Sequence, residues 1–340
     1  MASYNSEAVR LGIIMEQIQI KPTCFYHPIS ALFVDDNKSF LATLELEFAK
    51  YSGVLTCTDP HKALELIKQS EEDISQLIIH QVDDMELDET SGHLVDIRLD
   101  QIAKIIYNAN RGKFIAVAVI DYDMPEMNGI ELASALSRSQ ICKIILTVKA
   151  DEKLAVQAFN DGIIDQFLIK ANNDEMNSGI LSAIAKLKQR YFDRLSTGIM
   201  DSLGKSFKDL IASSNFQMLF DRAYHQAGAI EYYLVDKEGS YLFLDQEANP
   251  TWLIVQSNKA IETTIAMLEA SDSPSSVVNA LRQREKILFL PANDDYKQLD
   301  TLENNLFEAN RLGDDHFYSI VKGKITRFID WDKVKPCHFA

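Results

Sequence analysis

Residues 116–129, "AVAVIDYDMPEMNG", hold the pattern that decides the fold of this chain. Five apolar residues lead to Asp121, and Pro125 and Gly129 follow soon after it. A near-continuous aliphatic run is typical of a strand that is buried on both faces of a parallel sheet. Proline and glycine end such a strand. We therefore expect Asp121 to stand at the rim of a buried sheet, which raises the question of what a carboxylate does there.

The same alternation of apolar strand and helix occurs on both sides of this stretch. We predict buried strands at 30–36 ("SALFVDD"), 54–58, 113–123, 143–148 and 166–170, with helical segments between them. Strands that alternate with helices form a parallel sheet covered on both faces. The expected fold of this part is therefore α/β, a flavodoxin-like doubly wound five-stranded parallel sheet with strand order 2-1-3-4-5.

Side chains at the strand ends predict a reactive site. Asp35 and Asp36 end the first strand and Asp121 ends the third, and these two strands are neighbours in the order 2-1-3-4-5. Three carboxylates at close range repel one another, and Mg²⁺ with oxygen ligands is the usual compensation. Thr147 ends the fourth strand and Lys170 the fifth. Carboxylates, Mg²⁺, a lysine and a hydroxyl together fit phosphoryl transfer onto a carboxylate, with Asp121 as nucleophile.

The constellation resembles the receiver domain of two-component response regulators, whose fold is CheY-like. Four motifs carry the resemblance: "VDD" (34–36), "DYDMPEMNG" (121–129), "LTVKA" (146–150) and "FLIK" (167–170). The resemblance implies a partner that donates the phosphoryl group, either a sensor histidine kinase or a phosphotransfer protein. It also implies that Mg²⁺ is the cofactor.

The resemblance also implies a role for each matched residue. Asp121 corresponds to the phosphorylated residue, and Asp36 of the acidic pair corresponds to a direct Mg²⁺ ligand. By the same resemblance, Asp35 completes the acidic pair and the backbone carbonyl of Asp123 is a further metal ligand. Thr147 corresponds to the switch hydroxyl, Lys170 to the family's lysine and Phe167 to the switch aromatic residue.

The chain departs from the family pattern in three places. Ala171 stands where the family usually has proline after the lysine, so a cis peptide bond is in doubt there. Asp123 adds a negative side chain near the site. The connection at about 70–115 is much longer than usual, and within it residues 99–111 predict an amphipathic helix. This insertion is either a surface excursion, a partner surface or a segment packed on the second domain.

Residues beyond the receiver-like part predict a second domain. We divide the chain into an N-terminal extension (1–29), a receiver domain (30–172), a long linker helix (173–204) and an output domain (205–340). The linker helix has an apolar seam that includes Ile180, Ile184, Leu187, Tyr191 and Leu195. This seam packs either on its own sheet or in a dimer or signalling interface.

The output domain is expected to be α+β with a mainly antiparallel sheet. "EYYLVDKEGSYLFLDQ" (231–246) is a hairpin signal. Further strands are predicted at 251–256, 288–292, 317–322 and 325–331.

The composition of the chain disfavours several classes of partner and location. The net charge of -16 disfavours nucleic acid and anionic membranes as partners. The sequence shows no signal peptide, no membrane span and four scattered cysteines, so we expect a cytoplasmic protein. We find no signature of cyclase, phosphodiesterase or phosphatase output, and expect no enzyme activity beyond the receiver's own phosphotransfer and dephosphorylation.

The favoured output is an interaction module switched by phosphorylation, with a phosphorylation-dependent homodimer. The alternatives are a DNA-binding transcription factor and a domain that binds a nucleotide or small ligand. The arrangement also resembles stand-alone response regulators with an uncharacterised output domain, including those of the Legionella quorum-sensing circuit. "AFNDGIIDQFLIK" (158–170) and "EYYLVDKEGSYLFLD" (231–245) carry that similarity.

Overall fold

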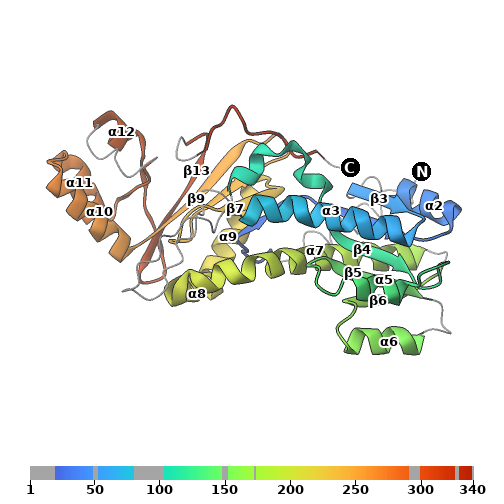
Figure 1. Ribbon diagram of the computed structural model, residues 1–340. Coiled ribbons are helices and arrows are strands. Elements are labelled where there is room, and N and C mark those ends of the chain that lie inside the picture. Colours follow the sequence, from blue (N-terminus) through green and yellow to red (C-terminus); the bar gives the residue numbers. More distant parts are fainter. Residues whose placement is uncertain are drawn as a thin grey trace, which may run out of the picture.

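A computed structural model describes seven stretches of the chain: residues 20–48, 53–79, 103–147, 152–171, 174–290, 299–325 and 329–338. The described residues build two main sheets, joined by a long helix (Figure 1). Among these stretches, no helix combines the length and the apolar character needed to cross a membrane.

The first sheet confirms the predicted receiver-like fold. Its strand order is β3-β2-β4-β5-β6, and all neighbouring pairs are parallel. Every residue of β2, β4 and β5 is buried, as their near-continuous aliphatic sequences predict. The bounds of the strands are β2 (Ser30–Val34), β3 (Gly53–Cys57), β4 (Ile115–Asp121), β5 (Cys142–Thr147) and β6 (Gln166–Ile169).

Helices cover this sheet. They are α2 (Lys38–Phe48), α3 (Pro60–Ile79), α5 (Gly129–Ala135), α6 (Glu152–Asn160) and α7 (Asp174–Ser202). Helices α3 and α5 contact each other, whereas α2 contacts α7 through Glu47 and the side-chain amide of Asn177. Figure 1 shows α7 continuing past the sheet toward α8 (Gly204–Ala212). The apolar seam of α7 is largely buried within this chain, because Ile180, Ile184, Leu187 and Tyr191 are at most 4% exposed.

The long connection before β4 differs from its prediction. Helix α3 extends to Ile79, so its last turns occupy the start of the segment that we assigned to the long connection. The single helix predicted at 99–111 is confirmed only in part: Ala103 is helical, but two short 3₁₀ helices follow it in place of a continuous α-helix, η1 (Lys104–Tyr107) and η2 (Ala109–Lys113). Asn108 has an extended backbone between them and its side chain accepts a hydrogen bond from the Asn110 N–H, so a new turn starts there. Residues 80–102 lie outside the described stretches.

The second sheet is antiparallel throughout, which confirms the α+β prediction. Its order is β1-β7-β8-β9-β13-β12, with strands β1 (Phe25–Tyr26), β7 (Glu231–Leu234), β8 (Tyr241–Leu244), β9 (Pro250–Ser257), β12 (Asn310–Leu312) and β13 (His316–Lys322). A two-stranded sheet of β10 (Lys286–Leu288) and β11 (Leu306–Glu308) lies beside it. The helices of this part are α8, α9 (Ser214–Ala227), α10 (Asn258–Ala270), α11 (Ser275–Arg282) and α12 (Leu299–Asn304).

One predicted strand of this part is wrong and another is displaced. Residue 325 and residues 329–331, the described part of the strand predicted at 325–331, are not in a strand. Trp331 instead packs edge-on against Trp252 of β9, with ring centroids 6.2 Å apart, and its indole N–H donates to the Ile325 carbonyl. The apolar side chains that suggested a strand therefore anchor a loop. The strand predicted at 288–292 occurs at Lys286–Leu288.

The two sheets meet in a junction formed by segments far apart in the sequence. Phe25 and Tyr26 pair with β7 of the second sheet, and the chain then enters β2 of the first sheet at Ser30. Arg111, just before β4, forms a buried ion pair with Glu231 of β7, at 2.5 Å. The C-terminal residues close over the same place: the backbone N–H groups of Lys335 and His338 donate to carbonyls of η1 and η2. β2 and β4 therefore both start at contacts with the second sheet.

Candidate functional site

The ends of β2 and β4 bring three carboxylates together, as predicted. Val34 pairs with Ile120 in the parallel register, so Asp35 and Asp36 emerge level with Asp121. Carboxylate oxygens of the three residues lie within 4.8 Å of one another. Asp35 and Asp121 are buried and Asp36 is exposed. The cluster can therefore be reached from solvent on the side of Asp36.

Lys170, which follows β6, joins this cluster. Its ammonium lies 2.6 Å from Oδ2 of Asp35 and 2.9 Å from Oδ1 of Asp121. Its backbone N–H donates to the Thr147 carbonyl at 2.7 Å, which fixes the end of β6 to the end of β5. The lysine side chain is 23% exposed. The Lys170 ammonium therefore bridges the carboxylates at the ends of β2 and β4. Lys170 itself follows β6, so its side chain crosses the end of β5, which lies between β4 and β6.

Among the described residues the charges of this cluster are not balanced, because three carboxylates face one ammonium. Burial raises the pKa of Asp121; the hydrogen bond from Lys170 opposes this rise and the negative charge of Asp35 adds to it. Burial favours the neutral form of Lys170, yet its hydrogen bonds to Asp35 and Asp121 hold the pKa of Lys170 above its ordinary value. An all-oxygen donor set with excess negative charge is the kind that a hard divalent cation binds. Asp35, Asp36 and Asp121 therefore fit Mg²⁺.

The loop after Asp121 folds back closely on the end of β4. The Gly129 N–H donates to the Tyr122 carbonyl at 2.9 Å, and a Cβ at position 129 would lie 2.3 Å from the Asp121 carbonyl oxygen. Helix α5 then starts with a capping box formed by Asn128 and Glu131. Only glycine allows this approach, which explains why the apolar strand is followed so soon by an Asn-Gly turn.

The other predicted site residues occupy the same end of the sheet. Thr147 ends β5 and is fully buried, and Phe167 is half-buried in β6, in register with Ile145 of β5. The side chain of Asp123 is exposed in the loop after β4. The metal-binding role of its carbonyl stays a prediction, as do the switch roles of Thr147 and Phe167. Among the described residues no peptide bond is cis, so the Lys170–Ala171 bond is trans.

One contact of the site was missed at the level of sequence. The Lys170 ammonium lies over the ring of Phe40 in α2, 4.7 Å from the ring centroid. Phe40 is half-buried and packs against the core. The sequence contains one signal for this contact. Phe40 is an aromatic residue four positions after Asp36, in the first turn of the helix that follows the acidic pair.

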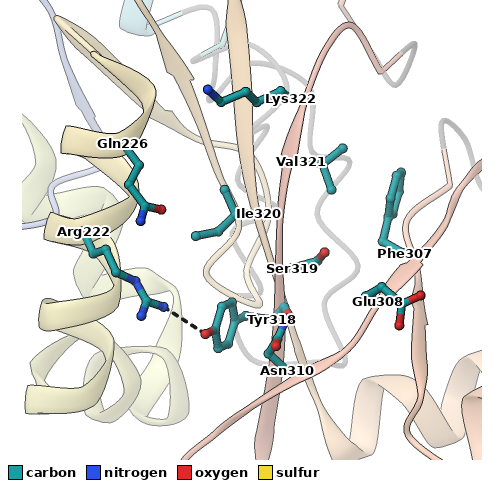
Figure 2. Close-up of a pocket in the computed structure, with 10 residues that line it drawn as sticks. All are labelled: Arg222, Gln226, Phe307, Glu308, Asn310, Tyr318, Ser319, Ile320, Val321 and Lys322. Atoms are coloured by element: carbon teal, nitrogen blue, oxygen red, sulfur yellow. Dashed lines mark hydrogen bonds between the residues drawn. The ribbon is translucent and has the colours of Figure 1, made fainter.

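The second domain contains a separate open groove with a volume of about 510 Å³. Figure 2 shows Arg222 and Gln226 of α9 pointing toward Tyr318 and Ile320 of β13. The Arg222 guanidinium donates to the Tyr318 hydroxyl at 2.9 Å. Lys322 lies at the other end of the groove (Figure 2). Glu308 lines the groove as well, but its carboxylate is paired with Lys286.

Comparisons with known proteins agree with this architecture. No protein-family model matches the chain, and no curated protein matches it. Among solved structures, the Legionella pneumophila response regulator LqsR is 29% identical, with a TM-score of 0.73, and the match covers 93% of this chain and 94% of that chain. This similarity extends over both sheets.

Two further matches cover about half of this chain. A receiver domain of the Francisella response regulator 1452 is 20% identical with a TM-score of 0.30, over 48% of this chain and 98% of that chain. The adenylate cyclase from Rhodopirellula baltica is 22% identical with a TM-score of 0.34, over 51% of this chain and 95% of that chain. At these scores the two matches support no conclusion about this chain.

Proposed function

We propose that this chain, which has the receiver domain and additional domain of a response regulator, accepts a phosphoryl group on Asp121 from a histidine kinase or phosphotransfer protein. The similarity to the Legionella response regulator supports this proposal over nearly the whole chain. The observation that carries it is the bridging of Asp35 and Asp121 by Lys170 within a cluster of three carboxylates. A purely structural ion pair would not need the third carboxylate.

The residues of the cluster suggest how the transfer proceeds. A carboxylate oxygen of Asp121 attacks the phosphorus atom, a new P–O bond forms, and the bond to the donor breaks with its electron pair leaving on the donor. Lys170 gives up its contact with Asp121 and binds a phosphoryl oxygen instead, while it keeps Asp35. The Thr147 hydroxyl donates to another phosphoryl oxygen. Bound Mg²⁺, held by Asp35, Asp36 and Asp121 with the Asp123 carbonyl, would neutralise charge on the phosphoryl group.

Phosphorylation by a small donor tests this proposal. Incubation with acetyl phosphate and Mg²⁺ should give one acyl phosphate per chain, detected by intact mass and located by peptide mapping at Asp121. Asp121→Asn should abolish it. Asp123→Asn is the matched control: it removes an exposed acid two residues away and keeps the backbone carbonyl. An unmodified wild-type protein, or modification of Asp121→Asn to the same extent, would refute the proposal.

We further propose that phosphorylation promotes a homodimer. The seam of α7, expected as one possible dimer surface, is largely buried in the single chain. The face formed by α6 and β6 is the better candidate, because Leu154, Phe159 and Ile169 are about half exposed there. Light scattering with beryllofluoride and Mg²⁺ should show a doubled mass that Phe159→Ser prevents. Leu46→Ser, at the most exposed apolar residue on α2, should leave the dimer intact. An unchanged mass with beryllofluoride would count against it.

The groove on the second domain favours one alternative output, the binding of a small organic anion. Within the described stretches, neither Arg222 nor Lys322 has a carboxylate partner, which is unusual in a chain of net charge -16. Phenyl phosphate should raise the unfolding temperature and phenol should not. Arg222→Ala and Lys322→Ala should each remove the effect, whereas Lys324→Ala, outside the groove, should retain it. Equal shifts with both compounds would exclude this output.

DNA binding and quorum sensing have less support. The strong negative charge opposes contact with a phosphate backbone. Lys333, one of the basic residues near the C-terminus, is paired with Asp330 at 2.9 Å. A role in quorum sensing rests on the resemblance alone and stays a prediction.

A further inference from the structure

Among the described residues, the Lys170 ammonium contacts two carboxylates and one aromatic ring. Asp35 and Asp121 accept its hydrogen bonds, and the face of the Phe40 ring lies beside it at 4.7 Å from the centroid. A cation over an aromatic face is attracted to the ring without using a specific hydrogen-bond direction. Phe40 therefore binds the ammonium in a way that survives a change of its hydrogen-bond partners.

The position of Phe40 is itself fixed by the acidic pair. Oδ1 of Asp35 accepts from the Asn37 N–H at 2.9 Å. The Asn37 side chain in turn accepts from the backbone N–H groups of Ser39 and Phe40, at 3.1 Å each. This is the N-terminal cap of α2. The ring is thus held by a short chain of hydrogen bonds that begins at the same carboxylate to which Lys170 is bound.

We propose that Phe40 is a positioning residue, whose ring holds the Lys170 ammonium while Lys170 exchanges its contact with Asp121 for one with the incoming phosphoryl group. This inference rests on the proposed phosphorylation of Asp121. During the exchange the ammonium loses one of its two carboxylate partners, and Asp35 and the ring remain. Without the ring, the long and flexible lysine side chain has one anchor and can turn toward solvent, to which it is already 23% exposed.

A simple packing role for Phe40 makes a different prediction. If the ring only fills space against the core, an apolar residue of similar size serves as well, and the cost appears in folding stability. If the ring holds the cation, an aromatic replacement restores function and an aliphatic one does not. The maximal rate of phosphorylation should then change, because the contact matters during the transfer, whereas the concentration of donor that gives half-maximal rate should not.

The experiment compares Phe40→Leu with Phe40→Tyr in the full chain. Phosphorylation by acetyl phosphate with Mg²⁺ is followed over a series of donor concentrations. Phe40→Leu should lower the maximal rate about threefold to tenfold, the range expected for a partly exposed cation–π contact. Phe40→Tyr should remain near the wild-type rate. Met267→Leu, at a half-exposed apolar residue of α10 that lies outside the site and the proposed dimer face, should leave the rate unchanged.

A second measurement follows Lys170 directly. In the unphosphorylated protein, acetic anhydride should modify Lys170 of Phe40→Leu faster than Lys170 of the wild type, with the exposed Lys62 of α3 as internal reference. If Phe40→Leu lowers the unfolding temperature, Phe40→Met takes its place in both measurements.

The outcomes separate this inference from the proposed function. A wild-type protein that acetyl phosphate does not modify refutes the proposed function, and the role of Phe40 falls with it. If the wild type is modified, the inference alone is overturned by any of three results: a wild-type rate in Phe40→Leu, a rate in Phe40→Tyr as low as that of Phe40→Leu, or an effect confined to the donor concentration needed.

Discussion

Two places in the molecule join charged side chains from distant segments: the junction between the two sheets, and the acidic pocket. Among the described residues, the charges are balanced at the junction and unbalanced in the pocket. The side chains of Arg111 and Glu231 are fully buried. Arg111 directs all of its donor groups to partners: two go to the Glu231 carboxylate and the rest to the carbonyls of Ile106, Asn108 and Lys335. The Tyr233 hydroxyl also donates to Glu231. The junction therefore pairs the positive charge of Arg111 with the negative charge of Glu231, and both groups have hydrogen-bond partners.

The acidic pocket is different in charge and in exposure. Counted over the described stretches, it has two more carboxylates than ammonium groups, and Asp36 faces solvent. Burial and the charge of Asp35 act on Asp121 in the same direction and raise its pKa. A balanced, enclosed pair fixes a structure, whereas an unbalanced cluster open to solvent has capacity for a further cation or a reacting group. This difference between the two clusters can be tested by substitution.

The largest effect is expected at the junction. Arg111→Met should lower the free energy of unfolding by about 3–5 kcal/mol, because it leaves the Glu231 charge buried without a partner. Urea denaturation measures this loss. The double variant Arg111→Met/Glu231→Leu should recover most of the stability, since no unpaired charge remains.

A surface pair supplies the control for this loss. Arg282→Met breaks the ion pair with Glu269, in which both side chains are about half exposed, and should cost less than about 1 kcal/mol. If Arg111→Met were no more damaging than Arg282→Met, the junction would not be the structural cluster that its burial indicates.

A smaller, pH-dependent effect is expected at His27, in the same junction. His27 is fully buried among the rings of Phe25, Phe114 and Phe192, and its Nδ1 lies 2.7 Å from the Pro28 carbonyl oxygen. Its Nε2 has no hydrogen-bond partner among the described residues. Burial lowers the pKa of His27 to about 3, and the nearby Arg111 charge adds to this.

The direction of the pH effect follows from this lowered pKa. The unfolded chain takes up the proton near pH 6.5 and the folded protein only near pH 3, so stability is lost as the pH falls from 6.5. One pKa unit corresponds to about 1.4 kcal/mol, so the full effect is a few kcal/mol. Unfolding temperatures between pH 7.5 and 5 should therefore fall less steeply for His27→Phe than for the wild type. His61→Gln, at an exposed histidine, should follow the wild type, and parallel curves for His27→Phe would rule out this origin.

The sequence predicted the receiver-like sheet and the position of its acidic pocket, for a physical reason. Strands β2, β4 and β5 are buried on both faces, so their aliphatic runs and the polar residues that end them are visible without any knowledge of partners. The parallel order then puts Asp35, Asp36 and Asp121 at one rim. The roles of these residues in phosphorylation remain predictions until the chemistry is measured.

The junction could not be predicted, because each of its parts depends on a distant partner. The two-residue strand β1 exists only through its pairing with Tyr232 and Tyr233 of β7. Arg111 lies in "NANRGK", a polar segment that reads as exposed, and nothing near it indicates that Glu231 will bury it. The described parts of the helix predicted at 99–111, which is broken into 3₁₀ turns, and of the wrong strand at 325–331 lie beside this junction. Local sequence patterns there are outweighed by contacts with remote segments.

The smallest effect is expected at Asp121, and its sign distinguishes the pocket from the junction. The folded-state pKa of Asp121 is raised above 3.8, so its contribution to stability is fully present below about pH 4 and is lost as the pH rises through the folded-state pKa. Asp121→Asn cannot ionise. Its free energy of unfolding relative to the wild type should therefore increase from pH 4 to pH 7.

Urea denaturation at several pH values, without Mg²⁺, measures this difference. Asp123→Asn, at an exposed acid in the same loop, should show no such trend. Removal of a charge would then stabilise the protein at the pocket, whereas Arg111→Met destabilises it at the junction. A loss of stability in Asp121→Asn that grows with pH would mean that the contact with Lys170 outweighs burial and the repulsion from Asp35. The pocket would in that case be a structural ion pair like the junction, with its charges in balance.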